Sequence, residues 1–140
     1  NGSYSISLFL GYLLIEIYNL NKEISPYFII VLLWYPCFEN LFSILRKLII
    51  NKNPLKADNY HLHHFLFVVI KERFSLNNLS SNNLSSLIIN FFNFFIIYLA
   101  SLEVGLTYYQ LILLSSCIFV YVLTYFILKR RFDLIMKNKV

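Results

Sequence analysis

Charged residues are scarce in this sequence. Only 14% of its 140 residues are Asp, Glu, Lys or Arg, whereas a soluble domain typically has about 25%. Hydrophobic residues make up 59%, and the mean hydropathy is +0.64. A chain with so little charge cannot cover itself with an ordinary water-exposed surface, so we interpret lipid as its main solvent.

Cysteines are few and widely separated. Cys37 and Cys117 each lie in an apolar run, with no CxxC spacing and no histidine beside them. This pattern argues against a disulfide framework and a zinc knuckle, and we expect both to be small core residues. A signal-peptide pattern is also lacking after Asn1. Because the chain does not begin with Met, we interpret it as the C-terminal part of a longer protein.

Four apolar runs dominate what is present. They cover residues 4–20, 26–50, 84–102 and 106–128, and a helix needs about 20 apolar residues to cross a bilayer. The sequence therefore predicts an all-α, polytopic integral membrane protein. In this prediction residues 1–140 form a single membrane domain with four transmembrane helices.

Two prolines and a short link refine this prediction. Pro26 is expected to open the second helix, where its missing N–H is not needed. Pro36 is expected to kink that helix in its middle, because it removes one helical hydrogen bond. The link at residues 103–105 is long enough only for a tight hairpin between the last two helices.

A polar stretch at residues 51–83 separates the second and third runs and carries the sequence HLHH. Residues 51–60 are rich in Asn, Pro and Asp, which predicts a loop. From residue 61 to residue 74 the helical spacing of apolar residues returns, which predicts a short amphipathic helix on the inner leaflet. Residues 75–86 (SLNNLSSNNLSS) are predicted to be a flexible connector that carries an N-cap serine for the next helix.

The positive charges are clustered. Apart from Lys22, all Lys and Arg residues lie at positions 46–56, 71–73 and 129–139. Because Lys and Arg concentrate on the cytoplasmic side of membrane proteins, this distribution predicts that the 51–83 loop and the C-terminus are cytoplasmic. Basic strips that border apolar runs favour phosphorylated ligands and anionic lipid over nucleic acid.

The three histidines are the most distinctive feature of the loop. In one continuous helix His63 would point away from His61, but the rings of His61, His63 and His64 can converge if the helix begins near Leu62. That arrangement leaves free backbone N–H groups beside the rings, which suits an anion such as a diphosphate. Lysines at positions 52, 56 and 71 add positive potential, and Asp58 can orient an imidazole or help to cap the helix. These residues are Lys52, Lys56, Lys71 and Asp58.

Glu39 is a second candidate. It falls roughly 20 Å along the helix from Pro26, in the inner half of the bilayer or at its inner boundary. Carboxylates at such depth are costly and tend to be functional. Two interpretations stay open: Glu39 contributes to a substrate site, or it is satisfied by a neighbouring helix or by Arg46.

Two alternative roles for the histidines also stay open. They can be ligands of zinc or iron in a histidine-ligated membrane metalloenzyme, although the sequence lacks the expected partner carboxylates and further histidine boxes. They can equally be surface residues of a non-enzymatic membrane anchor whose basic loop binds acidic lipid. Their position at a basic loop-to-helix junction favours an anion site over both.

At this loop the sequence resembles a known family. PLKADNYHLHH, followed by an apolar helix, is similar to the Pro-x-x-x-Asp-Arg-x-His-(Ile/Leu)-His-His motif of the polyprenyl-phosphate N-acetylhexosamine-1-phosphate transferases, glycosyltransferase family 4. The nearest branch is the undecaprenyl-phosphate GlcNAc-1-phosphate transferases. Asn59 stands where the family has Arg, so one expected phosphate contact is missing. The matching positions are Pro54, Asp58, His61, His63 and His64.

Two further stretches resemble the same family. WYPCFENLFSILRKL is similar to a helix with Pro-x-x-(Asp/Glu) that ends in Arg, and Pro36, Glu39 and Arg46 take the matching positions. The opening NGSYSISLFLGYLL is similar to the segment that follows the family's Gly-Asp. Its matching residues are Gly2, Ser3, Leu10 and Gly11.

The resemblance implies a transferase that moves a sugar-1-phosphate from a UDP-sugar, namely a UDP-N-acetylhexosamine, to polyprenyl (undecaprenyl) phosphate in the bacterial inner membrane. It implies a role in cell-wall or lipopolysaccharide biosynthesis, and it is compatible with a homodimer. It also implies Mg²⁺ held by aspartates that precede Asn1, so this chain alone is expected to be inactive and to contain no metal ligand. The expected substrate-binding residues are His61, His63, His64, Asp58, Arg46, Lys56 and Glu39.

Overall fold

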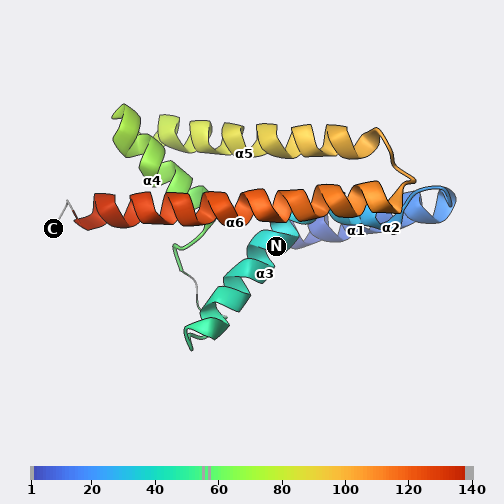
Figure 1. The fold of residues 1–140 in the computed structure, drawn as a ribbon, viewed down its shortest axis with the longest axis horizontal. Coiled ribbons are helices and arrows are strands. Elements are labelled where there is room, and N and C mark those ends of the chain that lie inside the picture. The colour runs from blue at the N-terminus through green and yellow to red at the C-terminus, as the bar shows by residue number, and fades with distance from the viewer. Residues whose placement is uncertain (1, 55, 57, 138–140) are drawn as a thin grey trace.

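The structure, a computed structural model, describes residues 2–54, 56 and 58–137. Within these ranges the chain is all-helical, as the sequence predicts, and contains no strand. Figure 1 shows α5 and α6 side by side along the long axis, with α4 near the C-terminal end of α6. The helices are α1 (Gly2–Leu20), α2 (Pro26–Leu32), α3 (Trp34–Ile49), α4 (Leu62–Phe74), α5 (Asn78–Ser101) and α6 (Thr107–Lys137).

The apolar helices are compatible with a membrane protein, but the prediction of four spans is confirmed only in part. Among the described residues, α5 and α6 are long and apolar enough to cross a bilayer. The pair α2 and α3 adds a third candidate only if its two helices, bent by 75°, count as one broken span. The apolar part of α1, Ser5–Leu20, is shorter than a full span. Two or at most three candidate spans result.

The break between α2 and α3 has a clear local cause. Pro26 opens α2, as predicted, and Ser25 caps that helix by accepting a hydrogen bond from the Tyr27 amide at 3.3 Å. Pro36 lies in the first turn of α3 and offers no N–H to the carbonyl of Leu32, and its ring crowds that carbonyl. The chain therefore breaks at Leu33, three residues before the proline, and the result is two helices rather than the predicted kink within one.

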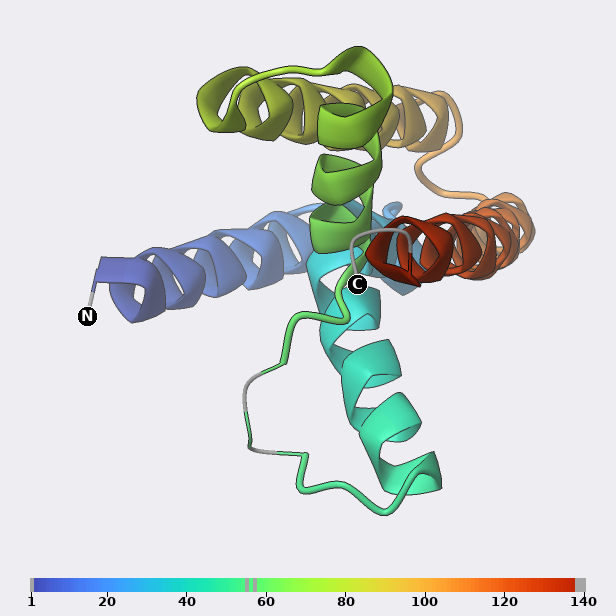
Figure 2. The ribbon, with the colours of Figure 1, turned by 90° about the vertical axis from the view of Figure 1, so that its left-hand side faces the viewer.

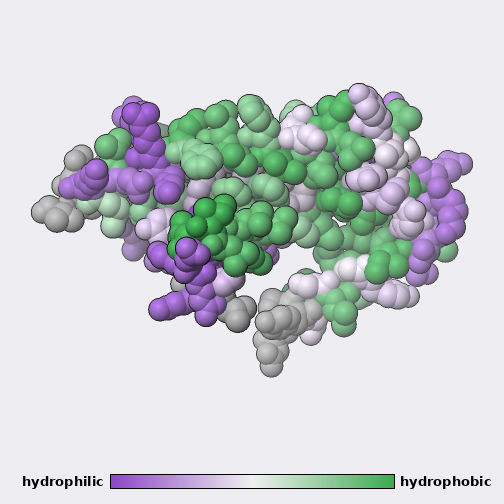
Figure 3. All heavy atoms as spheres, turned by 60° about the horizontal axis from the view of Figure 1, so that its bottom comes forward, coloured by the Kyte–Doolittle hydropathy of each residue, from purple (hydrophilic) through white to green (hydrophobic). Residues whose placement is uncertain are grey.

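The polar residues of α3 face inward. Glu39, Ser43 and Lys47 recur at intervals of four and are all buried, whereas the exposed face is apolar. Figure 2 shows α3 and α4 extending in different directions from the centre of the molecule, both transverse to α6. On the face drawn in Figure 3, hydrophilic residues gather toward the two ends and on one projecting segment, with hydrophobic residues between them. The exposed apolar residues of α3 include Leu41, Ile44, Leu45, Leu48 and Ile49.

The start of α5 contradicts the predicted connector. The helix begins at Asn78, and Asn77 rather than a serine is the N-cap, since its side chain accepts a hydrogen bond from the Ser80 amide at 2.7 Å. Ser81 and Ser85 are buried, and such small side chains let α5 pack closely against a neighbour. Tertiary packing has therefore overridden the weak helix preference of a Ser- and Asn-rich segment.

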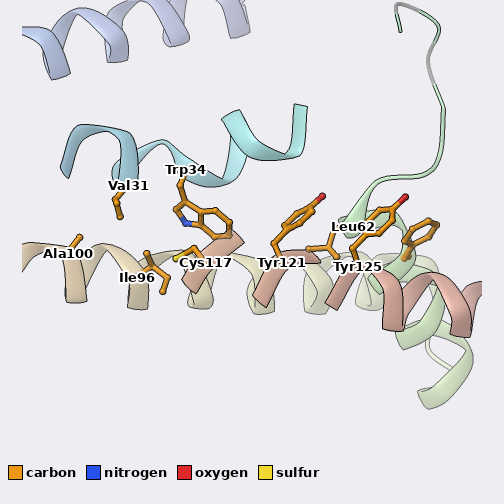
Figure 4. Close-up of a cluster of buried hydrophobic side chains, with 9 residues drawn as sticks. Val31, Trp34, Leu62, Ile96, Ala100, Cys117, Tyr121 and Tyr125 are labelled. Atoms are coloured by element: carbon orange, nitrogen blue, oxygen red, sulfur yellow. The ribbon is translucent and has the colours of Figure 1, made fainter. Parts of the chain in front are cut away.

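The core joins α2 to α6 along one row of side chains. Figure 4 shows Val31 and Trp34 facing Ile96, Ala100 and the buried residues of α6, with Tyr121 and Tyr125 adjacent and their hydroxyl groups directed the same way. Cys117 belongs to this core, as predicted, but Cys37 is exposed, so the prediction of a core position is wrong for that residue.

The turn before α2 and the turn before α6 meet at one end of the molecule. The Ser25 amide donates to the carbonyl of Val104 at 2.9 Å, and the hydroxyls of Ser25 and Thr107 are 2.9 Å apart. A Cβ atom at Gly105 would lie only 2.7 Å from the carbonyl oxygen of Glu23. We call this junction the turn clasp. The short link between the end of α5 at Ser101 and the start of α6 at Thr107 confirms the predicted tight hairpin.

Candidate functional site

The histidine segment has the predicted backbone. His61 is the N-cap of α4, with an extended conformation (φ −101°, ψ 149°), and the helix starts at Leu62. The carbonyl of His61 accepts hydrogen bonds from the amides of His64 and Phe65, both at 3.1 Å. The first turn of α4 is thereby fixed to the end of the loop, and the His61 ring lies outside the helix.

Glu39 lies at the centre of the site. One carboxylate oxygen, Oε1, accepts a hydrogen bond from the Leu62 amide at 3.0 Å and is 3.0 Å from Nδ1 of His61. The other oxygen, Oε2, accepts a hydrogen bond from the hydroxyl of Tyr121 in α6 at 2.5 Å. The hydrogen-bond partners of the carboxylate thus lie in α4, α6 and the loop. Of the two partners expected for Glu39, a neighbouring helix or Arg46, the neighbouring helix is the one observed.

This arrangement differs in one respect from the sequence-based expectation of free backbone N–H groups beside the rings. The Leu62 amide is not free for an external anion, because the carboxylate of Glu39 already accepts from it. An anion that reaches this helix start would face that negative charge. Cationic side chains, rather than the first backbone N–H of α4, are therefore the groups available for binding a phosphate here.

Asp58 holds the loop against α3. Its Oδ2 accepts a hydrogen bond from Arg46 at 2.9 Å, and its Oδ1 accepts one from the Tyr60 amide at 3.3 Å and lies 3.6 Å from Nε2 of His61. Partial burial acts to raise the pKa of Asp58, but the Arg46 and Tyr60 hydrogen bonds and the charges of Arg46 and Lys47 together lower that pKa below its ordinary value of 3.8. Asp58 is therefore ionised and faces the imidazole, and it does not cap α4.

The three imidazole rings do not all converge. The rings of His61 and His63 stack with centroids 5.6 Å apart, whereas His64 is turned to Phe132 of α6, with centroids 6.0 Å apart. Nδ1 of His64 is buried and has no hydrogen-bond partner among the residues that the structure describes. The rings of His61 and His63 therefore form one cluster. Residues two apart within a helix face different sides, but His61 precedes α4, so its ring can reach that of His63. The ring of His64 faces α6 instead.

His63 combines an exposed surface with crowding around its ring. Desolvation by the neighbouring atoms lowers its pKa below the ordinary value of 6.5; the Glu39 carboxylate opposes this effect, and His61 and His64 add to it. The ring is consequently harder to protonate than an ordinary histidine ring.

Two cavities that the structure describes flank the site, and Tyr60 lines both of them. The first, about 480 Å³, is basic; the second, about 650 Å³, lies between the loop and the end of α6. Nζ of Lys47 donates to the carbonyls of Pro54 and Lys56, which keeps the loop around the first cavity. The first cavity is lined by Lys47, Lys52, Asn53, Lys56, Asp58 and Tyr60, and the second by Asn59, Tyr60, His64, Val68, Phe132, Asp133, Met136 and Lys137.

The predicted residues are largely brought together. Glu39, Arg46, Asp58 and His61 form a connected network, and Lys52 and Lys56 line the basic cavity. Lys71 lies in the last turn of α4 and lines neither cavity. Sequence reasoning missed Lys47, Tyr60, Tyr121 and Phe132. Only Tyr121 had a usable signal, because it and Tyr125 place two hydroxyls four residues apart on one face of an apolar run.

No metal centre is apparent in this site. Within residues 2–54, 56 and 58–137, no group of three or more His, Cys, Asp or Glu residues is placed to hold a metal ion.

Comparison with protein families, with curated proteins and with solved structures finds no match. The function must therefore be inferred from the arrangement of side chains.

Proposed function

We propose that this chain is the C-terminal part of a membrane glycosyltransferase that moves a sugar-1-phosphate from a UDP-sugar to a polyprenyl phosphate. One observation carries the proposal. Two separate stretches that resemble the transferase family, the Glu39–Arg46 helix and the Asp58–His61 loop, meet in one hydrogen-bonded network. A network between two such stretches has no evident use in a simple membrane anchor.

The chemistry requires positive charge around a diphosphate. A phosphate oxygen of the lipid forms a bond to the β-phosphorus of the UDP-sugar, the bond from that phosphorus to the bridging oxygen breaks, and UMP leaves with the electron pair. The rate of such a transfer depends mainly on positioning and on charge stabilisation. Lys52 and Lys56 in the basic cavity would bind the phosphates, and His61, oriented by two carboxylates, would donate a hydrogen bond to a phosphate oxygen.

Other parts of the enzyme would lie outside this chain. Mg²⁺, when bound, would neutralise charge on the phosphates, and its ligands are proposed to precede Asn1. The aspartates needed for catalysis are proposed to lie there as well, so we expect the isolated 140 residues to be inactive. A UDP-N-acetylhexosamine is the proposed donor and undecaprenyl phosphate the proposed acceptor.

We further propose four spans in a bacterial inner membrane, with the histidine loop and the C-terminus in the cytoplasm. The clusters of Lys and Arg at residues 46–56 and 129–137 support this orientation. The turn clasp supports it too, because it holds the two links with few positive charges together at the opposite end from these clusters. A homodimer is compatible with the large exposed apolar surface.

The proposal is tested in the full-length protein reconstituted into lipid, by measuring UMP release and lipid-linked sugar. We expect His61→Ala to lower transfer on the order of 100-fold, and His63→Ala and His64→Ala to lower it less. Lys71→Ala is the control, since Lys71 lies in the last turn of α4, away from the contacts that His61 makes with Glu39 and Asp58 at the helix start. Membrane insertion is checked in each variant. Full activity of all three histidine variants would contradict a role in phosphate binding and would favour a membrane anchor.

A further inference from the structure

Tyr121 connects the last helix to the histidine segment. It is 3% exposed, and its hydroxyl donates to Oε2 of Glu39 at 2.5 Å across 82 positions of sequence. The opposite oxygen of the same carboxylate contacts His61 Nδ1 and the Leu62 amide. A single carboxylate therefore stands between the hydroxyl on α6 and the two groups that begin α4.

The Tyr121 ring is itself held in place. It packs edge-on against Phe38, with centroids 5.0 Å apart, and against Phe42, with centroids 5.5 Å apart. These two residues flank Glu39 on α3. The ring also lies nearly parallel to that of Tyr125, with an interplanar angle of 16°. Because the ring is enclosed on several sides, its hydroxyl is a fixed point for the carboxylate.

A fixed hydrogen-bond donor on one oxygen of a carboxylate determines where the other oxygen points. The two oxygens lie in one plane, and the terminal torsion of a glutamate is otherwise broad. Without the Tyr121 hydroxyl, Oε2 would be left buried without its donor, and the carboxylate could turn away from the helix start. A buried charged group that loses a hydrogen bond is costly, so such a turn would follow readily.

We propose that Tyr121 is a positioning residue that acts through Glu39. Through that carboxylate it fixes the start of α4 and orients His61 for the diphosphate of the donor substrate. This inference rests on the proposed function for the identity of the ligand, but the orientation itself does not depend on catalysis.

A second tyrosine on the same helix provides a matched control. The hydroxyl of Tyr109 donates to the carbonyl of Leu99 at 2.9 Å and so joins α6 to α5, near the turn clasp and away from the histidines. Tyr109→Phe and Tyr121→Phe thus remove one hydroxyl each, from the same helix, and each hydroxyl makes one hydrogen bond.

The first measurement is independent of activity. Hydrogen exchange of the peptide that contains Leu62, and modification of His61 by diethylpyrocarbonate, are followed in the full-length protein in lipid nanodiscs. We expect both to increase about tenfold in Tyr121→Phe, because the Leu62 amide and the His61 ring lose a fixed acceptor. Tyr109→Phe is expected to match the wild type. Glu39→Gln, which retains the shape of the side chain but not its charge, should behave as Tyr121→Phe does.

The second measurement separates positioning from general stability. Tyr121→Phe should raise KM for the UDP-sugar about tenfold and leave KM for the polyprenyl phosphate unchanged. A hydroxyl that only stabilises the fold would lower the amount of active enzyme and would leave both KM values unchanged. If Tyr121→Phe matches Tyr109→Phe in exchange and modification, the inference is overturned. If exchange and modification change as expected but the wild-type protein transfers no sugar, the proposed function fails and the orienting role of Tyr121 stands.

Discussion

The turn clasp and the histidine end are held together in different ways. At the turn clasp, the chain is joined by hydrogen bonds of backbone and hydroxyl groups and by a backbone contact at Gly105 that leaves no space for a side chain. At the histidine end, it is joined by charged side chains that lie beside two cavities. The Ser25 amide and the carbonyl of Val104 close the first end. Glu39, Arg46, Asp58 and His61 hold the second. The close packing at the turn clasp, which leaves no room for an additional atom, suits a structural role. Ionic contacts beside open volume suit the binding of a charged ligand, and the two ends should therefore respond differently to substitution.

The largest effect is expected at Glu39. Glu39→Ala leaves the Leu62 amide and the Tyr121 hydroxyl without their acceptor, and each buried unsatisfied group costs about 1–3 kcal/mol. The free energy of unfolding should fall by about 2–5 kcal/mol, and transfer per folded molecule by on the order of 100-fold. Thermal unfolding and the transfer assay provide the measurements. Glu16→Ala, which removes a carboxylate from α1, serves as the control, and an equal loss in that variant would show that Glu39 has no special place.

An intermediate effect is expected at the turn clasp, and on stability alone. Gly105→Ala places a Cβ atom 2.7 Å from the Glu23 carbonyl oxygen, so the two turns must separate. Overpacking of this kind costs about 1–3 kcal/mol. Gly11→Ala is the matched control, because a Cβ there meets nothing within 4 Å. Activity per folded molecule should stay at the wild-type level in both variants, and a specific loss in Gly105→Ala would contradict the division between the two ends.

The smallest effect is a dependence of ligand binding on pH. Because desolvation lowers the pKa of His63 below 6.5, the ring gains its proton only as the pH falls below that value. Affinity for the UDP-sugar should therefore rise a few-fold as the pH falls from about 7.5 through the lowered pKa. The same shift acts on stability with the opposite sign: the contribution of neutral His63 is present above pH 6.5 and is lost as the pH falls through the lowered pKa. Calorimetric titration of wild type and His63→Gln checks this, and an unchanged pH dependence in the variant would assign it to another group.

Local signals in the sequence predict much of the histidine end. A polar loop followed by apolar periodicity from residue 61 places the start of α4 within one residue of its observed start at Leu62. The depth of Glu39 in the second apolar run singles out that carboxylate. These features depend on a few neighbouring residues. The partner of Glu39 on α6 could not be predicted, because the pairing with Tyr121 arises only when helices far apart in sequence pack together.

Other features of the fold also depend on packing rather than on composition. The stretch at 78–86 resembles a linker in its Ser and Asn content, but Ser81 and Ser85 are buried on a packed face. The second apolar run resembles one span, but the inward polar stripe of α3 and the break at Leu33 divide it. The number of apolar residues in a segment does not tell which way their side chains point in the folded chain.

The presence of Tyr60 in the lining of both cavities has a further consequence. Tyr60 packs edge-on against Phe65, lies 5.3 Å from the Arg46 guanidinium, and accepts a hydrogen bond from Tyr125 through its carbonyl. These three contacts hold Tyr60 in place where it lines both cavities. A substitution at Tyr60 would therefore alter the lining of both cavities at once.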